Sequence, residues 1–198
     1  MRTFISVTVV LLIIVVITQA FIVRSVSKTE QHKYVVLKEF DGFEVRQYAP
    51  ALFSSVKLNA DSYDETANSG FRILAGYIFG GNESNEKIAM TSPVAMEIDD
   101  TSKMSFMVPA GYDESNLPKP SNSKIYFEKK DQKIMAAIQF GGWANDEKIE
   151  EHKKKLAGLL EKNGIQHNGR FSYLGYDPPY TLVGRRNEVV VELTDFKK

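Results

Sequence analysis

The stretch that decides the fold covers residues 80–99 and reads GGNESNEKIAMTSPVAMEID. Between residues 88 and 98, the even positions carry mostly large apolar side chains, and the odd positions carry small or polar residues and one proline. This alternation predicts a β-strand whose even face, with Met90 and Met96, points into the core. Pro93 has no amide hydrogen for a sheet ladder, so we expect the strand to lie at an edge or to bend there.

A helix and a glycine stop precede this strand. Residues 61–79 carry apolar side chains at three- and four-residue spacing, which predicts an amphipathic helix. Gly80 and Gly81 follow at the place where a left-handed C-cap is expected. The unit is therefore a helix, a glycine stop, a polar turn and a strand.

The rest of the chain repeats these elements. Asp41-Gly42 lies between two alternating runs and predicts a hairpin of residues 34–40 and 43–48. A second amphipathic helix is predicted at residues 146–162, with Asn145 as its N-cap. Further strands are expected at residues 51–58, 94–98, 104–108, 124–130, 133–140, 170–176 and 188–193. Both halves then have strands, one helix and two more strands, which indicates an α+β fold of pseudo-duplicated halves, with two helices on a curled, largely antiparallel sheet.

The first 24 residues are set apart by their apolar side chains. No charged residue lies between Arg2 and Arg24, and about twenty apolar residues suffice for a helix to span the hydrocarbon core of a bilayer. Residues 1–24 therefore predict either a transmembrane anchor or a signal peptide.

A cleavable signal peptide would have its apolar core at residues 7–17 and a small-residue cleavage site at Thr18-Gln19-Ala20. The apolar run continues beyond that site, which favours an uncleaved anchor. An anchor places the protein at a membrane through one N-terminal helix, whereas cleavage makes it secreted or periplasmic. Residues 25–33 are polar and predict a linker to a domain at residues 34–196.

Composition disfavours several functions. The 25 basic and 25 acidic residues give a formal net charge of zero, and no basic block stands out, so a nucleic-acid partner is disfavoured. The absence of cysteine excludes disulfides, thiolate metal sites, a cysteine nucleophile and covalent haem attachment through Cys-x-x-Cys-His. No serine nucleophile elbow and no His-x-x-x-His pair is present. The sequence therefore favours a binding protein over an enzyme.

The three histidines are the candidate metal ligands among the side chains. His32 lies in the linker, His152 on the second predicted helix and His167 in the loop after it. His152 falls on the apolar stripe of its helix, where a partly buried, hydrogen-bonded histidine is the usual outcome. It is therefore a weak candidate for an axial ligand, and no firm metal site is predicted.

An aromatic stretch at residues 173–188 is the other candidate binding element. It contains several tyrosines, the pair Pro178-Pro179 and the pair Arg185-Arg186. Packing of this loop on its own domain is one interpretation. The other is the binding of a flat ligand with an acidic edge, because aromatic rings and arginines suit such a ligand.

Four spaced motifs follow one another along the chain. They read FEVRQYAPA at residues 43–51, KIAMTSPV at 87–94, FGGW at 140–143, and GYDPP at 175–179 with RRNEV at 185–189. Through them, the chain from about residue 34 to residue 193 resembles the SOUL haem-binding protein family. The resemblance implies a distorted antiparallel β-barrel flanked by two helices.

The same resemblance implies non-covalent binding of haem or another porphyrin. Together with the N-terminal segment, it leads to the hypothesis of a haem buffer or carrier at a membrane. The alternative is a protein-interaction or structural module that has kept the barrel and lost the ligand. The implied contacts lie on the first helix and in the loop at residues 176–182. They are Phe71, Arg72, Leu74, Ile78, Tyr176, Tyr180 and Leu182.

The sequence departs from the family at positions that hold the ligand in relatives. Gln47 occupies the position of an axial histidine, and the positions of basic residues that hold propionates correspond to Asn68, Gly76 and Thr181. Arg72 is the remaining cation of the helix. We therefore expect weak, largely apolar binding of a flat macrocycle, so that metal-free protoporphyrin binds about as well as haem.

Overall fold

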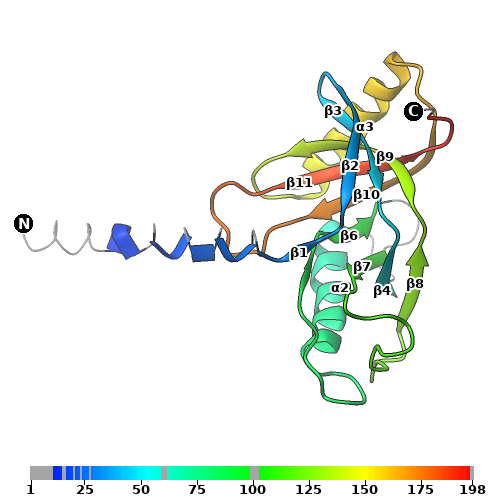
Figure 1. Cartoon of the computed structure of the whole chain (residues 1–198). Coiled ribbons are helices and arrows are strands. Elements are labelled where there is room, and N and C mark those ends of the chain that lie inside the picture. The colour runs from blue at the N-terminus through cyan, green and yellow to red at the C-terminus, as the bar shows by residue number, and fades with distance from the viewer. Residues whose placement is uncertain are drawn as a thin grey trace, which may run out of the picture.

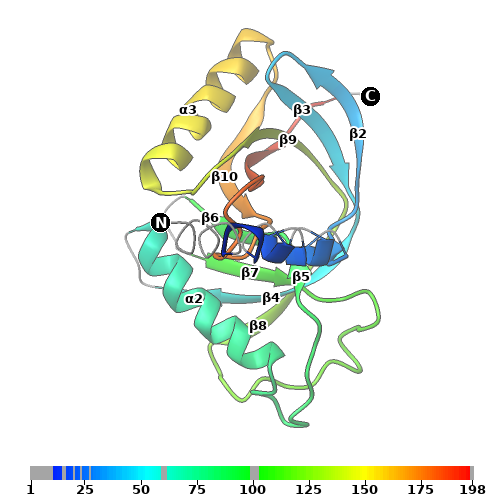
Figure 2. The same cartoon turned by 90° about the vertical axis from the view of Figure 1, so that its left-hand side faces the viewer.

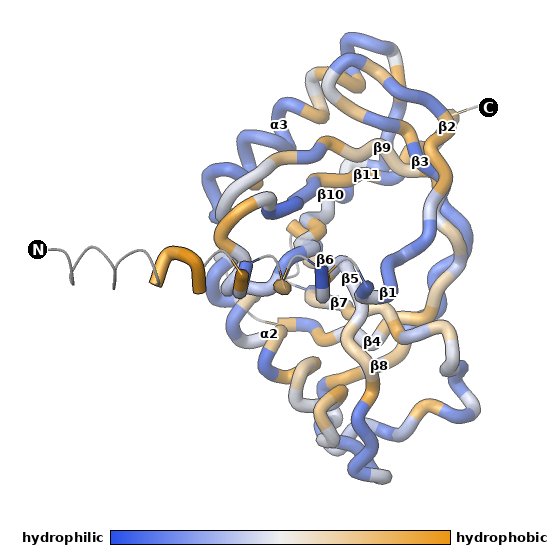
Figure 3. The backbone as a smooth tube through the Cα atoms, turned by 60° about the vertical axis from the view of Figure 1, so that its left-hand side comes forward, coloured by the Kyte–Doolittle hydropathy of each residue, from blue (hydrophilic) through white to orange (hydrophobic). Residues whose placement is uncertain are grey.

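The computed structural model describes residues 11–14, 17–19, 21–22, 24–26, 28–58, 62–98 and 103–196. The predicted anchor or signal peptide at residues 1–24 lies largely outside these ranges. Within the ranges, no helix is both long enough and apolar enough to cross a bilayer. Figure 3 shows the apolar character of the described part of this segment where it leaves the domain. The roles of anchor and signal peptide, and the location that each implies, stay predictions.

In the described part of the chain, nine strands form one antiparallel sheet in the order β2-β3-β9-β11-β10-β6-β7-β4-β8. The sheet curls into a half-barrel (Figure 2), and the strands at its two edges, β2 and β8, do not pair with each other among these residues. The predicted antiparallel sheet is confirmed, and the barrel is open rather than closed. The strands are β2 (Tyr34–Phe40), β3 (Phe43–Tyr48), β4 (Ala51–Lys57), β6 (Val94–Glu97), β7 (Lys103–Met107), β8 (Ile125–Lys130), β9 (Lys133–Phe140), β10 (His167–Gly175) and β11 (Asn187–Leu193).

The order of the strands is symmetric about the β10–β6 pair. Outwards from this pair, one side reads β10-β11-β9-β3, followed by β2 as an additional strand at the edge, and the other reads β6-β7-β4-β8. If β3, β4, β6 and β7 of the first half correspond to β8, β9, β10 and β11 of the second, the two sides match strand for strand. Each half also carries one helix (Figure 1). This is the arrangement expected of two similar halves.

Two helices cover one face of the sheet. The helix α2 (Tyr63–Ile78) packs on β4 and β7, and α3 (Asp146–Lys162) packs on β9 and β11. Side chains of both helices contribute to one hydrophobic core with the strands beneath them. Asn145 caps α3 as predicted, because its side chain accepts a hydrogen bond from the Lys148 amide at 2.9 Å. Gly80 has a φ of +111°, which confirms the glycine stop after α2.

The stretch at residues 88–98 forms two short strands instead of one. The strand β5 (Thr91–Ser92) pairs in parallel with β1 (Glu30–Gln31), and β6 begins after Pro93. Of the two outcomes expected at Pro93, the bend is confirmed as a division of the strand, and the edge position is wrong, because β6 pairs with both β10 and β7. β1 falls in the predicted linker, where a polar sequence gives no strand signal.

The even face of this stretch is only partly in the core. Ile88 and Met96 are buried, whereas Met90 is half-buried. Thr91, on the opposite face of the predicted strand, is also buried, and its hydroxyl donates to the Met107 carbonyl at 2.6 Å. The pairing with β1 therefore replaces the simple alternation over this segment.

Candidate ligand-binding groove

Three of the residues predicted to contact a porphyrin are buried. Leu74 and Ile78 lie on the inner side of α2, with 0% and 4% of their surfaces exposed, and they are part of the hydrophobic core. Tyr176 is buried as well, and its hydroxyl donates to Glu188 Oε2 at 2.9 Å. In this conformation these side chains are engaged by the protein itself.

The other four predicted residues reach the surface in two separate elements. Phe71 and Arg72 are exposed on α2, and the Phe71 ring meets the edge of Phe106 at 5.4 Å between centroids. Tyr180 and Leu182 are exposed in the loop between β10 and β11. The predicted set therefore divides between a helix surface, a loop surface and the interior.

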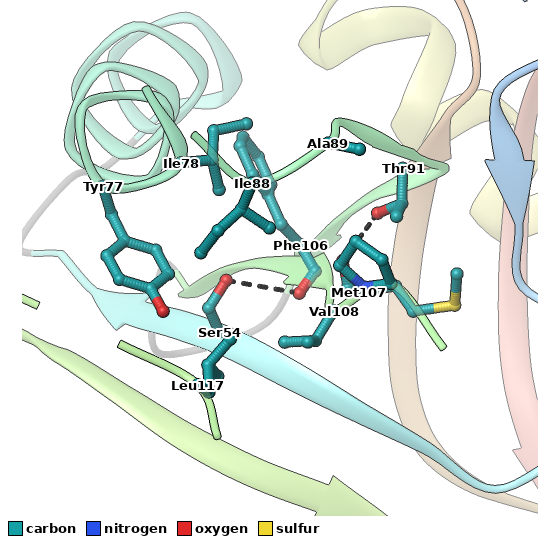
Figure 4. A pocket seen from close by; sticks show the side chains of 11 residues that line it. Ser54, Tyr77, Ile78, Ile88, Ala89, Thr91, Phe106, Met107, Val108 and Leu117 are labelled. Carbon is teal, nitrogen blue, oxygen red and sulfur yellow. Dashed lines mark hydrogen bonds between the residues drawn. The ribbon is translucent and has the colours of Figure 1, made fainter. Parts of the chain in front are cut away.

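The inner side of α2 has no room for a macrocycle. Figure 4 shows the cavity beside the C-terminal end of the helix, between Tyr77, Ile78, Ile88 and Phe106. Its volume is about 10 Å³, and a single water needs roughly 10–15 Å³. Any porphyrin beside α2 must therefore lie on another side of the helix.

The outer side of α2 borders an open groove of about 650 Å³. This volume falls within the range of about 300–1,000 Å³ that is usual for small-molecule sites. The helix lies on the half of the sheet that ends at β8 (Figure 1, Figure 2). The lining residues come from the end of β4, from α2 and from the start of β8. They are Lys57, Leu58, Glu65, Ser69, Arg72, Ile73, Lys124 and Tyr126.

The groove combines positive charge with apolar walls. Lys57, Arg72 and Lys124 are cations and Glu65 is an anion, which gives the described lining an excess of positive charge. Leu58 and Ile73 are aliphatic. Tyr126 adds a ring, and burial raises the pKa of its phenol. Such a surface suits a flat apolar ligand with carboxylate groups at its edge.

The histidines are engaged elsewhere in the fold. The His152 ring stacks on Phe140 at 4.2 Å between centroids, and its Nδ1 lies 2.7 Å from the Lys148 carbonyl oxygen. His32 packs between Tyr48 and Phe53, at 5.1 and 5.5 Å between ring centroids. None of the residues that line the groove is a histidine. Among the described residues, no group of three or more His, Cys, Asp or Glu side chains could hold a metal ion.

The comparison with known families decides the identity of the fold. A family model described as "SOUL heme-binding protein" matches residues 29–192. The chain belongs to the SOUL family. The resemblance found in the four motifs is thereby confirmed.

Relatives within the SOUL family cover most of the chain. Heme-binding protein 1 of Xenopus laevis is 30% identical over 172 residues, which cover 82% of this chain and 90% of the relative. Heme-binding protein 2 of Mus musculus is 30% identical over 156 residues, which cover 74% of this chain and 76% of the relative.

Solved structures with the same fold are much more distant in sequence. The crystal structure of the EcmrR C-terminal domain aligns with a TM-score of 0.58 at 9% identity, over 78% of this chain and 98% of that domain. A hydrolase from Listeria innocua aligns with a TM-score of 0.54 at 9% identity, over 86% of this chain and 96% of its own. At this identity the likeness shows the fold alone.

The first and the last of the four SOUL motifs meet in a buried charge network that sequence reasoning missed. Glu188 is fully buried and accepts hydrogen bonds from Arg46 at 2.8 Å, from Arg186 at 2.7 and 3.0 Å, and from Tyr176 at 2.9 Å. The Arg186 amide also donates to Asp177 Oδ2 at 2.7 Å. Charged groups can be buried when they are paired in this way. The motifs that identify the family therefore include residues that hold its strands together.

The arginine pair of the aromatic stretch is also engaged by the protein. Arg185 donates to the carbonyl oxygens of Pro178 at 2.8 Å and Thr181 at 3.1 Å, and its guanidinium lies 4.3 Å from the ring centroid of Trp143. Arg186 donates hydrogen bonds to Glu188. The interpretation of this stretch as a loop that packs on its own domain accounts for both arginines.

Proposed function

We propose that the protein binds haem or another porphyrin non-covalently in the groove beside α2. The carrying observation is the combination of Lys57, Arg72 and Lys124 with the apolar surfaces of Leu58 and Ile73 in one groove of about 650 Å³. The names of the SOUL relatives as heme-binding proteins support the ligand class. A buffer or carrier role follows from reversible, non-covalent binding.

The groove explains how binding proceeds without a strong iron ligand. Burial of apolar surface contributes about 25 cal/mol per Å² before association costs are subtracted. The cations add charge-assisted hydrogen bonds to the two propionates, each stronger than a neutral hydrogen bond. Haem and metal-free protoporphyrin should therefore bind with similar affinity.

We place this binding activity at a membrane, with residues 1–24 as the anchor. The support is the uncharged apolar run between Arg2 and Arg24. Flotation of the full chain with phosphatidylcholine vesicles, and its resistance to carbonate extraction, test this part separately. Recovery of a mature protein that begins at Phe21 would instead establish a signal peptide.

The binding site is tested by one charge reversal and a matched control. Arg72→Glu changes a cation that lines the groove, and Lys155→Glu makes the same change at an exposed position of α3. Titration by Soret absorbance for haem and by fluorescence for protoporphyrin should show at least tenfold weaker binding for Arg72→Glu and no change for Lys155→Glu.

Three outcomes would contradict this assignment. Equal porphyrin affinities of Arg72→Glu and the parent would show that the porphyrin does not bind in the groove. A sharp low-spin haem spectrum that disappears in His152→Ala would make His152 the axial ligand and place the site on α3. Failure of the parent to bind either porphyrin would favour the alternative of an interaction module that has lost its ligand, to which the departures at Gln47, Asn68, Gly76 and Thr181 point.

A further inference from the structure

The loop between β10 and β11 presents apolar side chains to solvent at its tip. Tyr180, Leu182 and Val183 are exposed to 62%, 58% and 71%. Single exposed apolar residues are normal on a protein surface, but these three lie within four consecutive positions. Thr181 between them is fully buried and faces the domain. The tip is therefore two-sided, with its apolar side chains pointing outwards.

The inner side of the loop is held in place by the domain. Arg185 donates to the Pro178 and Thr181 carbonyl oxygens, and its Nη2 also donates to the Asp177 carbonyl at 3.3 Å. Pro178 and Pro179 restrict the backbone at the start of the turn. A loop fixed in this way presents its apolar tip at little entropic cost.

Gln19, in the helical residues 17–19 of the N-terminal segment, contacts this tip directly. The Gln19 side chain donates from Nε2 to the Tyr180 carbonyl at 3.3 Å and accepts at Oε1 from the Leu182 amide at 3.0 Å. A polar side chain in an apolar helix is favourable only where it is hydrogen-bonded. Both groups of the Gln19 amide are therefore satisfied by the backbone of the loop.

Apolar side chains of this segment are also exposed in the described structure, and the backbone tube in Figure 3 has the colour of hydrophobic residues over the described part of the segment. The exposed side chains are Leu11, Leu12, Ile13, Ile14, Ile17 and Phe21. Gln19 precedes Arg24, which ends the uncharged run, by five residues, or about 8 Å along a helix. The contact with the loop thus falls near the end of the apolar run, at the depth where a membrane interface is expected.

We infer that the loop tip, residues 180–183, inserts into the interfacial layer of the same bilayer that holds the N-terminal segment. A phospholipid interface supplies an apolar environment for Leu182 and Val183, and tyrosines such as Tyr180 are enriched at that depth. This inference rests on the proposed membrane location. With two attachments, helix and loop, the domain has a fixed orientation to the membrane surface.

The test compares two tryptophan probes in the full chain. Trp143 is the single tryptophan of the sequence, so Trp143→Phe gives a background without tryptophan emission. Leu182→Trp in this background reports on the tip, and Phe79→Trp reports on an equally exposed position, at 64%, that follows α2. Both variants are placed in phosphatidylcholine vesicles that contain lipids brominated near the headgroup or near the bilayer centre.

We expect lipids brominated near the headgroup to quench the Leu182→Trp probe at least threefold more than the Phe79→Trp probe. Lipids brominated near the bilayer centre should quench it less. Equal quenching of the two probes in a chain that floats with the vesicles would overturn the loop inference and leave the anchor intact. Failure of the chain to float would overturn both, whereas porphyrin binding is measured independently of either.

Discussion

Replacing Glu188 by glutamine should destabilise the fold strongly, because a charge balance inside the sheet is lost. Glu188 is fully buried and pairs with two arginines, Arg46, which is 3% exposed, and Arg186, which is 27% exposed. Glu188→Gln retains the shape of the side chain and removes its charge. Loss of one partner from a buried ion pair costs about 3–5 kcal/mol. Glu44 still contacts Arg46 at 2.7 Å, and Arg186 is partly exposed to water. We therefore expect the lower end, about 3 kcal/mol.

The matched control removes the other carboxylate from the same guanidinium. Glu44 is 37% exposed, and exposed ion pairs contribute only about 0–1 kcal/mol. Glu44→Gln should therefore have little effect, although it also loses a hydrogen bond to Arg46. The comparison separates the burial of the carboxylate from the number of ion pairs.

Urea unfolding of the full chain in a mild detergent, followed by circular dichroism, measures both variants. With a slope of about 2 kcal/mol per molar urea, a loss of 3 kcal/mol lowers the midpoint by about 1.5 M for Glu188→Gln. The midpoint for Glu44→Gln should fall by less than about 0.5 M. Equal shifts for the two variants would refute the argument from burial.

Three further predictions concern the fold around the site. Met96→Asp buries an unpaired carboxylate in the core and should lower the melting temperature sharply in a circular dichroism scan, whereas Ala89→Ser, at an exposed position, should leave it unchanged. Asn145→Ala removes the cap of α3 and should cost about 1 kcal/mol in urea unfolding, a loss that an intact midpoint would rule out. Burial lowers the pKa of His32 below 6.5, so the unfolded chain takes up this proton at a higher pH than the folded chain. The contribution of His32 to stability should therefore be complete above about pH 6.5 and decrease as the pH drops below it. In a His32→Phe variant, the urea midpoint should not show this decrease between pH 6.5 and 5.

The sequence predicted those helices and hairpins whose ends are fixed by nearby residues. The bounds of α3 follow from the Asn145 cap and the apolar stripe, and the β2–β3 hairpin follows from Asp41-Gly42. The pairing of β1 with β5 could not be found in this way, because Glu30–Gln31 is polar and joins its partner through backbone groups alone. The strand order could not be predicted from local signals either, because β3 and β8 each pair with a strand of the opposite half.

The predicted site residues show what a hydrophobic pattern cannot distinguish. An apolar stripe on α2 indicates that Leu74 and Ile78 are covered, but it does not distinguish cover by a sheet from cover by a ligand. The structure assigns both to the core. Arg72 lines the groove with Lys57 and Lys124, which lie 15 and 52 positions away in the sequence. This group of three cations forms only when α2 packs against the sheet, so no sequence motif predicts it.

The way the groove is built bears on the source of its affinity. Because its three cations come from the end of β4, from α2 and from the residue before β8, its shape depends on how α2 rests on the sheet. Leu74 fixes that position from the core, as does Tyr77, whose hydroxyl donates to the Pro118 carbonyl at 2.8 Å. A groove framed by packed core residues is preorganised, which reduces the entropy cost of binding. In a groove lined by no histidine, preorganisation, apolar contact and charge pairing are the contributions that remain, and affinity should therefore follow Arg72 and the propionates rather than the iron.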